Sequence, residues 1–339
     1  MLNHFTIPSN AFTGPVLITG AGGCIGAWTI AMLLKNNIDV IACDLTNNKK
    51  RPELLIDSQD LSKVPWIEGD IADTESVLNT IEKYKPESII HLAALQVPFC
   101  AADPTGGAKV NVVGTVNVME AAKQNSIKRI AHASSMAAHS FLPGSDSLKT
   151  LYGAYKMCDE QISEVYWQDH KVPSVCLRPA IVNGVGRDQG MTSKQTEAML
   201  AAALGQPYDI PYKGNVSHLS AAEVASAFIH SVSYDGDGAF VFDIFGESVN
   251  INETIKMIKE IKNKLDSKFI GYCDRESKTF CLNLHEDDWK IDMLIVHEIC
   301  HTFRNCSTHG KLWNSKMIKV SDRCDKLNNH RLADQIRHD

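Results

Sequence analysis

Short apolar runs alternate with amphipathic segments along the first 262 residues. The apolar runs are rich in β-branched residues and end at polar residues, glycine or proline, which predicts strands at residues 15–19, 39–43, 88–94, 129–135, 174–180 and 239–245. Between them, apolar side chains recur every three or four positions, which predicts helices at residues 26–37, 74–84 and 114–125. This alternation predicts an α/β fold with a doubly wound parallel sheet covered by helices on both faces.

A glycine-rich loop, TGAGGCIG, occupies residues 19–26 between the first strand and the first helix. Gly20 can take a tight turn, Gly23 lets the backbone approach a pyrophosphate, and Gly26 allows close packing of the helix on the strand. Free N–H groups at the start of the helix favour phosphate. The alternative is an ordinary strand–helix turn. The order of strand, loop, helix and strand favours a dinucleotide site.

The second predicted strand leads into Asp44. A carboxylate at this place can accept hydrogen bonds from a ribose 2′-hydroxyl and repels a 2′-phosphate. The predicted cofactor is therefore NAD rather than NADP.

Tyr152 and Lys156 are four residues apart, so they share one face of a predicted helix. An ammonium beside a phenol stabilises the phenolate. Such a tyrosine can take the proton of an alcohol while the hydride leaves for a nicotinamide. Tyrosine and lysine at this spacing alone are more often a solvated helix face.

Residues 1–262 resemble the extended short-chain dehydrogenase/reductase family of NAD-dependent epimerases, dehydratases and dehydrogenases. Besides the loop and the Tyr152/Lys156 pair, the resemblance includes GDI at 69–71, HLAA at 91–94, NVVGT at 111–115, SS at 134–135 and LRPAIVNG at 177–184, in family order. It implies a Rossmann-type sheet and cofactor contacts from Gly20, Gly23, Cys24, Ile25, Gly26, Asp44, Asp70, Ile71, Leu92, Ala93, Ala94, Asn111, Tyr152, Lys156 and Pro179.

The resemblance also implies a role for each residue at the reacting centre. Ser135 would hold the substrate oxygen, Tyr152 would be the acid and base, and Lys156 would bind the nicotinamide ribose. Pro179 would lie beside the nicotinamide ring. Family members often pair through a two-helix face, so a homodimer is expected.

Two segments bear on the substrate. Nucleotide-sugar members of the family usually carry an arginine near residues 214–225, which here read GNVSHLSAAEVA and contain none. This leaves room for a simpler sugar, a sugar acid or a hydroxy acid. The polar segment 186–196 is expected either to border the substrate pocket or to be a solvated loop.

The composition changes after residue 262. The 77 residues of 263–339 hold 5 of the 10 cysteines and 6 of the 13 histidines, which predicts metal-type chemistry there. A hairpin is predicted at 268–285 and a helix at 287–304. His297 and His301 share one face of that helix, Glu298 could activate a metal-bound water, and His309 could be the third ligand. A polar helix face, or a sulfur-rich site with Cys300 and Cys306, is the alternative.

Residues 269–317 resemble the SprT-like zinc metallopeptidases. The resemblance implies one zinc ion held by His297, His301 and His309, catalysis by Glu298, and a polypeptide substrate. The predicted organisation is an NAD-binding domain at 1–262, truncated at its C-terminal end, and a small, partial α+β zincin-like domain at 263–339. The join could be a natural fusion, a rearranged gene or a chimera.

Bulk composition excludes some classes of function. The formal net charge is −6 and the charged residues form no basic stripe, so nucleic acid is not an expected partner. No apolar run reaches the length of a membrane span, and the N-terminal residues show no basic segment followed by an apolar core, so a cytoplasmic protein is expected. Three hypotheses remain: an NAD-dependent oxidoreductase or epimerase acting on a sugar-like alcohol, a zinc peptidase with a scaffold, and a non-catalytic cofactor-binding module.

Overall fold

A computed structural model describes residues 5–204, 206–234 and 236–268. The chain divides into two compact units, one of Met1–Ser193 with Val216–Ser248 and one of Lys194–Asn215 with Val249–Asp339. Candidate functional residues within the described ranges belong to the first unit. The predicted hairpin and zinc-site helix lie outside the described residues.

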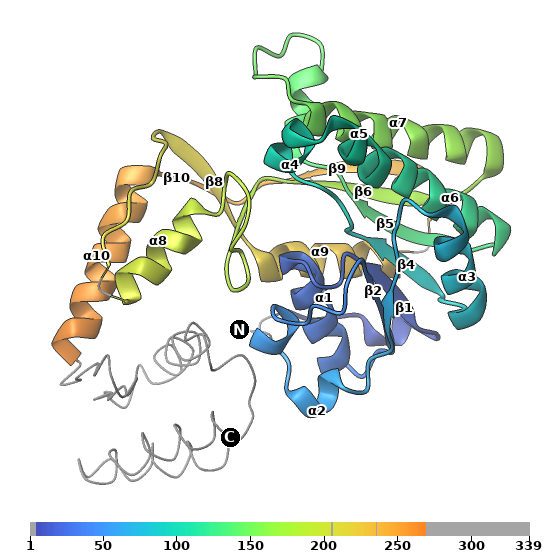
Figure 1. The fold of residues 1–339 in the computed structure, drawn as a ribbon, viewed down its shortest axis with the longest axis horizontal. Coiled ribbons are helices and arrows are strands. Elements are labelled where there is room, and N and C mark those ends of the chain that lie inside the picture. The colour runs from blue at the N-terminus through green and yellow to red at the C-terminus, as the bar shows by residue number, and fades with distance from the viewer. Residues whose placement is uncertain (1–4, 205, 235, 269–339) are drawn as a thin grey trace. The chain divides into compact units, whose positions relative to one another are not determined.

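A parallel sheet forms the centre of the first unit (Figure 1). Its seven strands within the described residues follow the order β3-β2-β1-β4-β5-β6-β9, and each neighbouring pair is parallel. Their bounds are β1 (Val16–Thr19), β2 (Val40–Asp44), β3 (Trp66–Glu68), β4 (Ser88–His91), β5 (Arg129–Ala133), β6 (Ser174–Pro179) and β9 (Ala239–Ile244). This confirms the predicted doubly wound α/β fold.

The strand order reverses between β1 and β4. In doubly wound sheets, ligands bind outside the carboxyl ends of the strands at such a point, because the connecting segments diverge there and leave a crevice. The two strands are in register from Val16 opposite Ser88 to Thr19 opposite His91. Thr19 and His91 therefore mark the edge of the sheet at which the cofactor site is expected.

Helices cover both faces of the sheet (Figure 1). On one side, α1 (Cys24–Lys35) packs against α9 (Ala221–Ser233), and on the other lie α3 (Thr74–Tyr84), α6 (Gly114–Gln124) and α7 (Leu151–His170). The predicted helices at 26–37, 74–84 and 114–125 are confirmed to within two residues at each end.

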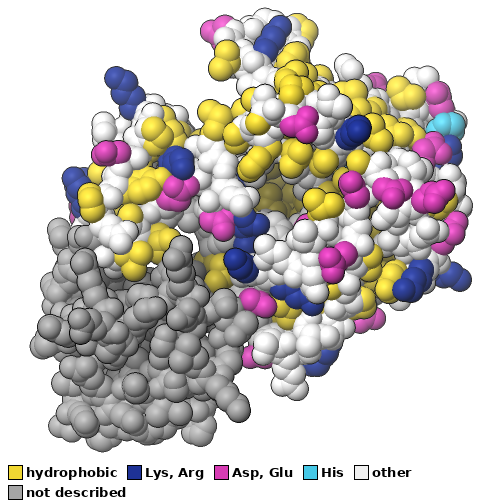
Figure 2. Space-filling model, in the orientation of Figure 1, with side chains coloured by type: hydrophobic (Ala, Val, Ile, Leu, Met, Phe, Trp, Pro, Cys, Tyr) yellow, Lys and Arg dark blue, Asp and Glu magenta, His cyan; other side chains and the backbone are white. Residues whose placement is uncertain are grey.

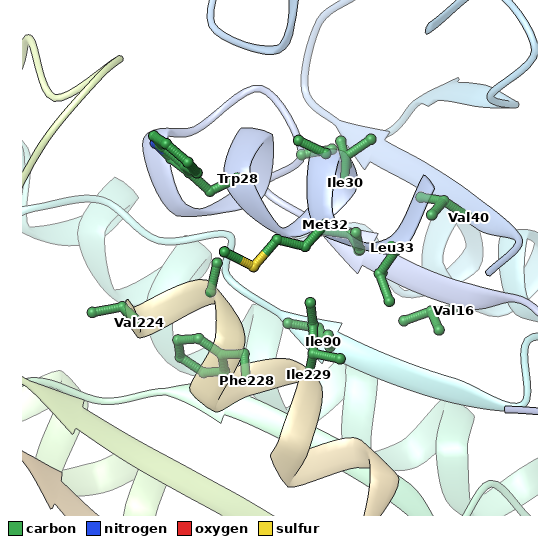
Figure 3. Packing of buried hydrophobic residues seen from close by; sticks show 14 of the residues in the cluster. Val16, Trp28, Ile30, Met32, Leu33, Val40, Ile90, Val224, Phe228 and Ile229 are labelled. Atoms are coloured by element: carbon green, nitrogen blue, oxygen red, sulfur yellow. The ribbon is translucent and has the colours of Figure 1, made fainter. Parts of the chain in front are cut away.

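Buried side chains of α1 pack against α9, as Figure 3 shows. Met32 and Leu33 of α1 point toward Phe228 and Ile229 of α9, and the side chains are almost fully buried. Burial of aliphatic and aromatic side chains on this scale contributes about 1.5–3 kcal/mol each. The packing fixes α1, and with it the glycine loop that precedes it, against the sheet.

Smaller elements complete the described chain. The helices α2 (Ser58–Leu61), α4 (Val97–Ala102) and α5 (Pro104–Ala108) follow strands β2 and β4, and α5 continues into a short π-helix, η4 (Lys109–Val113). A second sheet has the order β10-β8-β7, from β7 (Ile181–Asn183), β8 (Asn215–Ser220) and β10 (Glu247–Asn250). In the second unit, α8 (Lys194–Ala203) contacts α10 (Ile251–Lys268).

The surface carries both positively and negatively charged side chains. On the face drawn in Figure 2, Lys and Arg side chains are interspersed with Asp and Glu over the described residues, with no broad patch of one sign. None of the described helices is both long and apolar enough to cross a membrane.

Candidate active site

In the loop after β1, neighbouring backbone leaves no room for a side chain at Gly20 or Gly26. Gly20 has φ +70°, and a Cβ there would lie 2.7 Å from the backbone nitrogen of Ala93. A Cβ on Gly26 would clash with the carbonyl oxygen of Gly20. At Gly23, which caps α1, no side chain accepts a hydrogen bond from the first turn. The start of α1 therefore presents N–H groups and a positive dipole end to a ligand.

A cavity of about 360 Å³ lies beside this loop. Its lining comes from the carboxyl ends of the central strands and the segments that follow them: Thr19, Gly20, Gly22, Gly23, Cys24, Ile25, Gly26, Cys43, Asp44, Leu45, Thr46, Asn48, Arg51, Gly69, Asp70, Ile71, Leu92, Ala93, Ala94, Leu95, Gln96, Val110, Ala133, Gly186, Arg187, Asp188 and Gln189. The cavity thus lies at the reversal of strand order, where a dinucleotide is expected.

Asp44 is held at the cavity wall by backbone donors. The N–H of Gly22 donates to Oδ2 and the N–H of Leu45 donates to Oδ1, each at 2.8 Å. Both carboxylate oxygens are thus held by the backbone. The anion that the sequence predicts beside a ribose is therefore oriented in advance.

The segment from Val185 to Gln189 borders the same cavity. The Nε1 of Trp28 donates to the carbonyl of Val185 at 3.1 Å, and the Sγ of Cys24 lies 3.5 Å from the same oxygen. Burial raises the pKa of the Cys24 thiol to about 12, although Arg187 and Arg51 act in the opposite direction. Cys24 is therefore a neutral packing group and a weak donor rather than a nucleophile.

Tyr152 and Lys156 lie near the start of α7, on a helix as their spacing predicts. Thr150 caps this helix by accepting a hydrogen bond from the N–H of Gly153 at 3.0 Å. The Nζ of Lys156 lies 6.0 Å from the centroid of the Tyr152 ring. The Lys156 side chain is only 2% exposed and also contacts Asp159 Oδ2 at 3.1 Å. The Lys156 ammonium is therefore withdrawn from solvent, whereas Tyr152 is half-buried.

Ser135 is placed close to this helix by the short helix η5 (Met136–Phe141). Ser135 caps η5 and its Oγ accepts a hydrogen bond from the N–H of Ala137 at 3.1 Å. A Cβ on Gly153 would lie 2.5 Å from the carbonyl oxygen of Ala137. The absence of a side chain at Gly153 therefore lets the residue after Tyr152 pack directly against the segment that begins at Ser135.

A buried ion pair joins the strand ends near the site. Arg178 donates to Glu160 from Nε at 2.7 Å and from Nη2 at 2.5 Å, and Ser134 also donates to Glu160. Ser134 precedes Ser135, and Arg178 precedes Pro179. One carboxylate of α7 thereby fixes the two chain segments that carry these predicted site residues.

Asn111 acts on the cavity through a backbone segment. It is fully buried in the π-helix η4, and its Nδ2 donates to the carbonyls of Leu95 at 3.1 Å and Gly107 at 3.0 Å. Leu95 lines the cavity, whereas Asn111 does not.

More than half of the chain matches a known protein family. Residues 16–239 match the NAD dependent epimerase/dehydratase family. The chain belongs to this family. The matched segment begins at the first residue of β1 and ends at the first residue of β9, so it includes the whole parallel sheet up to its last strand.

Proteins similar in sequence to this chain include two that are named UDP-glucose 4-epimerase. The enzyme of Mycolicibacterium smegmatis is 30% identical over 198 residues, 55% of this chain and 63% of that protein. The match therefore spans less than two thirds of this relative. The enzyme of Rhizobium leguminosarum bv. trifolii is 26% identical over 299 residues, 79% of this chain and 88% of that protein.

Solved structures share the fold. The UDP-glucose 4-epimerase of Thermus thermophilus, solved in complex with NAD, has a TM-score of 0.62 at 23% identity, with 74% of this chain and 83% of that chain covered. The L-threonine dehydrogenase of Clostridium difficile has a TM-score of 0.64 at 21% identity, with 75% and 82% covered.

The structure brings some of the predicted cofactor-binding residues together around the cavity. The cavity gathers the predicted residues of the glycine loop with Asp44, Asp70, Ile71, Leu92, Ala93 and Ala94. Asn111, Ser135, Tyr152, Lys156 and Pro179 are not among its lining residues. The predicted metal ligands His297, His301 and His309, and Glu298, lie outside the described residues. Within the described residues, no cluster of three or more His, Cys, Asp or Glu side chains could hold a metal ion.

Three features of the site were not predicted from the sequence. Arg51 and Gly186–Gln189 line the cavity, so part of the polar segment that was expected either to border the substrate pocket or to be a solvated loop lies beside the glycine loop. Asp159 pairs with Lys156 inside the protein. The only local signal for Asp159 is its i+3 spacing from Lys156, and Arg51 stands in a polar stretch that resembles an ordinary loop.

Proposed function

We propose that this chain is an NAD-dependent enzyme that acts on a secondary alcohol of a sugar or similar small molecule. The observation that carries the proposal is the buried ammonium of Lys156, 6.0 Å from the centre of the Tyr152 ring, on a helix packed against the segment that begins at Ser135. This arrangement supports proton removal from an alcohol, because a cation beside a phenol favours the phenolate that can accept the proton.

The residues of the cavity fit NAD. The uncapped start of α1 leaves backbone N–H groups open for a pyrophosphate, and Asp44 presents a carboxylate suited to ribose hydroxyls. Bound NAD would supply the acceptor for hydride from the substrate carbon. Tyr152 would remove the hydroxyl proton and return it later, Lys156 would hold the nicotinamide ribose, and Ser135 would orient the substrate oxygen. Pro179 would close one side of the nicotinamide site.

Two supports favour a sugar epimerase over a dehydrogenase that releases NADH. Both curated relatives described above are named UDP-glucose 4-epimerase. In addition, Arg51 links the glycine loop to the segment 186–189 across the lining of the cavity, which favours a retained cofactor. An epimerase returns the hydride within the same site, so it gains from retention. The lack of arginine in residues 214–225 keeps free sugars and sugar acids among the candidate substrates.

The test replaces Tyr152 with phenylalanine and measures turnover and NAD binding separately. Substrates would include UDP-glucose, free sugars, sugar acids and L-threonine. We expect Tyr152→Phe to abolish turnover and to leave NAD bound, because the ring stays in place while the proton acceptor is lost. Tyr155→Phe is the matched control, because the Tyr155 hydroxyl donates to the carbonyl of Pro104 at 2.9 Å and has no proposed role. Full turnover in Tyr152→Phe would contradict the proposal.

A second candidate activity is confined to residues 263–339, which we propose as a separate zinc-binding unit. Its support is the sequence pattern of His297, Glu298, His301 and His309. Elemental analysis of protein purified without added metal should find about one zinc per chain. Peptide cleavage should disappear in Glu298→Ala while the zinc remains. Protein that neither contains nor takes up zinc would remove this candidate and leave the NAD-dependent one unaffected.

A further inference from the structure

A buried carboxylate follows the proposed catalytic pair along α7. Lys156 has Tyr152 one turn before it and Asp159 about one turn after it, so the three side chains share one face of the helix. The Asp159 side chain is fully buried and its Oδ2 lies 3.1 Å from the Nζ of Lys156. The reaction proposed above makes no direct use of Asp159, although the carboxylate is closer to the ammonium than the Tyr152 ring is.

We propose that Asp159 is a positioning residue that keeps Lys156 charged and directed toward the proposed proton acceptor and cofactor ribose. The proposal rests on the proposed function, which assigns Lys156 these two tasks. Without a counter-ion, an ammonium that is 2% exposed would be costly to retain, because burial favours the neutral amine. Asp159 supplies that counter-ion from within the same helix, three residues after Lys156, at 3.1 Å from its Nζ.

The histidines and cysteines around Lys156 cannot act as its counter-ion, because they are uncharged at neutral pH. Among the described residues, the other titratable groups that interact with Lys156 are Tyr152 on α7, Cys100 on α4, His91 on β4, His132 on β5 and Cys176 on β6. Burial lowers the pKa of His91 well below its usual value and that of His132 to about 3, and the Lys156 charge lowers both further. Burial raises the pKa of both cysteines. At neutral pH these histidines and cysteines are therefore uncharged.

The neighbouring carboxylate of Glu160 is paired with Arg178. Glu160 interacts with Asp159, but both of its oxygens accept hydrogen bonds from Arg178. Burial raises the pKa of Asp159, whereas Lys156 and the hydroxyl of Thr115 lower it. Burial acts to lower the pKa of Lys156, but Asp159, together with Tyr152 and Cys176, outweighs it and the net direction is upward. The upward direction for Lys156 agrees with an ammonium that persists above neutral pH, whereas the raised pKa of Asp159 reflects the cost of burying its charge.

The direct measurement is a pH titration of Lys156 by NMR on protein with ¹³C-labelled lysine side chains, with the signal assigned by its loss in Lys156→Arg. In the native protein, the Lys156 signal should stay that of an ammonium at a pH where exposed lysines have begun to lose their protons. A Lys156 that loses its proton at lower pH than the exposed lysines would overturn the proposal. This measurement does not depend on whether any variant of Asp159 folds.

The variant Asp159→Asn removes the charge and retains the shape. Its Lys156 should lose the proton at lower pH than in the native protein, and NAD affinity should fall by about tenfold for each pH unit above that point. In the native protein, NAD affinity should stay flat over the same range. Native-like behaviour of Asp159→Asn in both measurements would overturn the proposal.

Glu160→Gln is the matched control, because it converts a neighbouring buried carboxylate to an amide and leaves the Lys156–Asp159 pair intact. It should lower stability without moving the titration of Lys156. If the native protein binds no NAD, the proposed function fails, and the NMR titration still decides whether Asp159 sustains the charge of Lys156. The two failures are therefore distinguishable.

Discussion

Arg51 donates two hydrogen bonds to the same oxygen of Asp188, from Nε at 3.0 Å and from Nη2 at 2.7 Å. Its Nη1 also donates to the carbonyl of Gly22 at 2.9 Å. One guanidinium thus joins the glycine loop to a segment more than 130 positions further along the chain. The Asp188 side chain is 61% exposed, so the ion pair is open to solvent and screened by salt.

Arg51→Met should therefore shorten the residence of NAD in the cavity. An exposed pair of this kind contributes up to about 1 kcal/mol, so dissociation should be faster by roughly two- to fivefold. Stopped-flow release of NAD measures this rate. Lys50→Met is the control, because Lys50 is an exposed neighbour outside the cavity lining. Added salt should speed release from the native protein more than from Arg51→Met, and equal salt responses would contradict the role of the pair.

Asp44→Ser should weaken the preference for NAD over NADP. The substitution removes the carboxylate that accepts hydrogen bonds from the N–H groups of Gly22 and Leu45 and that would repel a 2′-phosphate. A hydrogen bond to a charged group contributes about 1.5–3 kcal/mol, so NAD affinity should fall by at least about tenfold. Calorimetric titration with both dinucleotides measures the change. Asp39→Asn, an exposed site next to the opposite end of β2, should leave both affinities unchanged.

Gly26→Ala should disrupt the loop more than Gly23→Ala does. A Cβ at Gly26 meets the carbonyl of Gly20 at a clashing distance and also lies 2.9 Å from the carbonyl of Ala21, whereas a Cβ at Gly23 lies 3.0 Å from the Gly20 oxygen. Overpacking of this type costs about 1–3 kcal/mol, and here it meets backbone atoms that cannot rotate away. Urea denaturation of both variants gives the order of stability. The reverse order would show that the loop relaxes at Gly26.

Glu87 should contribute stability that is lost in acid. Its Oε2 accepts hydrogen bonds from the N–H groups of Thr13 and Gly14, and its Oε1 pairs with Arg129 at 3.0 Å. Burial acts to raise the pKa of Glu87, but these contacts outweigh it and the pKa lies below the ordinary 4.5. The folded state therefore binds the proton less readily than the unfolded state, so the contribution is complete above about pH 4.5 and is lost as pH falls below it.

The measurement is the free energy of unfolding as a function of pH. Glu87→Gln should lower stability at neutral pH and flatten the acid limb of the profile. Glu82→Gln is the matched control, since Glu82 is exposed on α3. An unchanged acid limb in Glu87→Gln would show that another group carries the dependence.

Strand and helix periodicity accounts for much of the observed fold. Strands β1, β2, β4, β5 and β6 coincide with the predicted apolar runs because buried parallel strands are apolar on both faces and stand out from their surroundings. Strand β9 also coincides with a predicted run, although it lies at the edge of the sheet and is partly exposed. The predicted runs at 88–94 and 129–135 continue past His91 and Ala133, where the strands end, because the residues beyond them are also small or apolar. Strands β3 and β7 have three residues each, too few for a periodic pattern to be visible.

The amino-acid sequence by itself determined the order of elements, the glycine loop, Asp44 after β2 and the four-residue spacing of Tyr152 and Lys156. These features are local, because each depends on a few neighbouring residues and on the period of a helix or strand. The tertiary structure alone decided that Arg51 meets Asp188, that Glu160 joins Arg178 to Ser134, and that the carboxylate of Asp159 is enclosed with Lys156. The physical reason is that a pairing between distant segments, or the burial of a charge, depends on how helices and strands pack, and no local period records that packing.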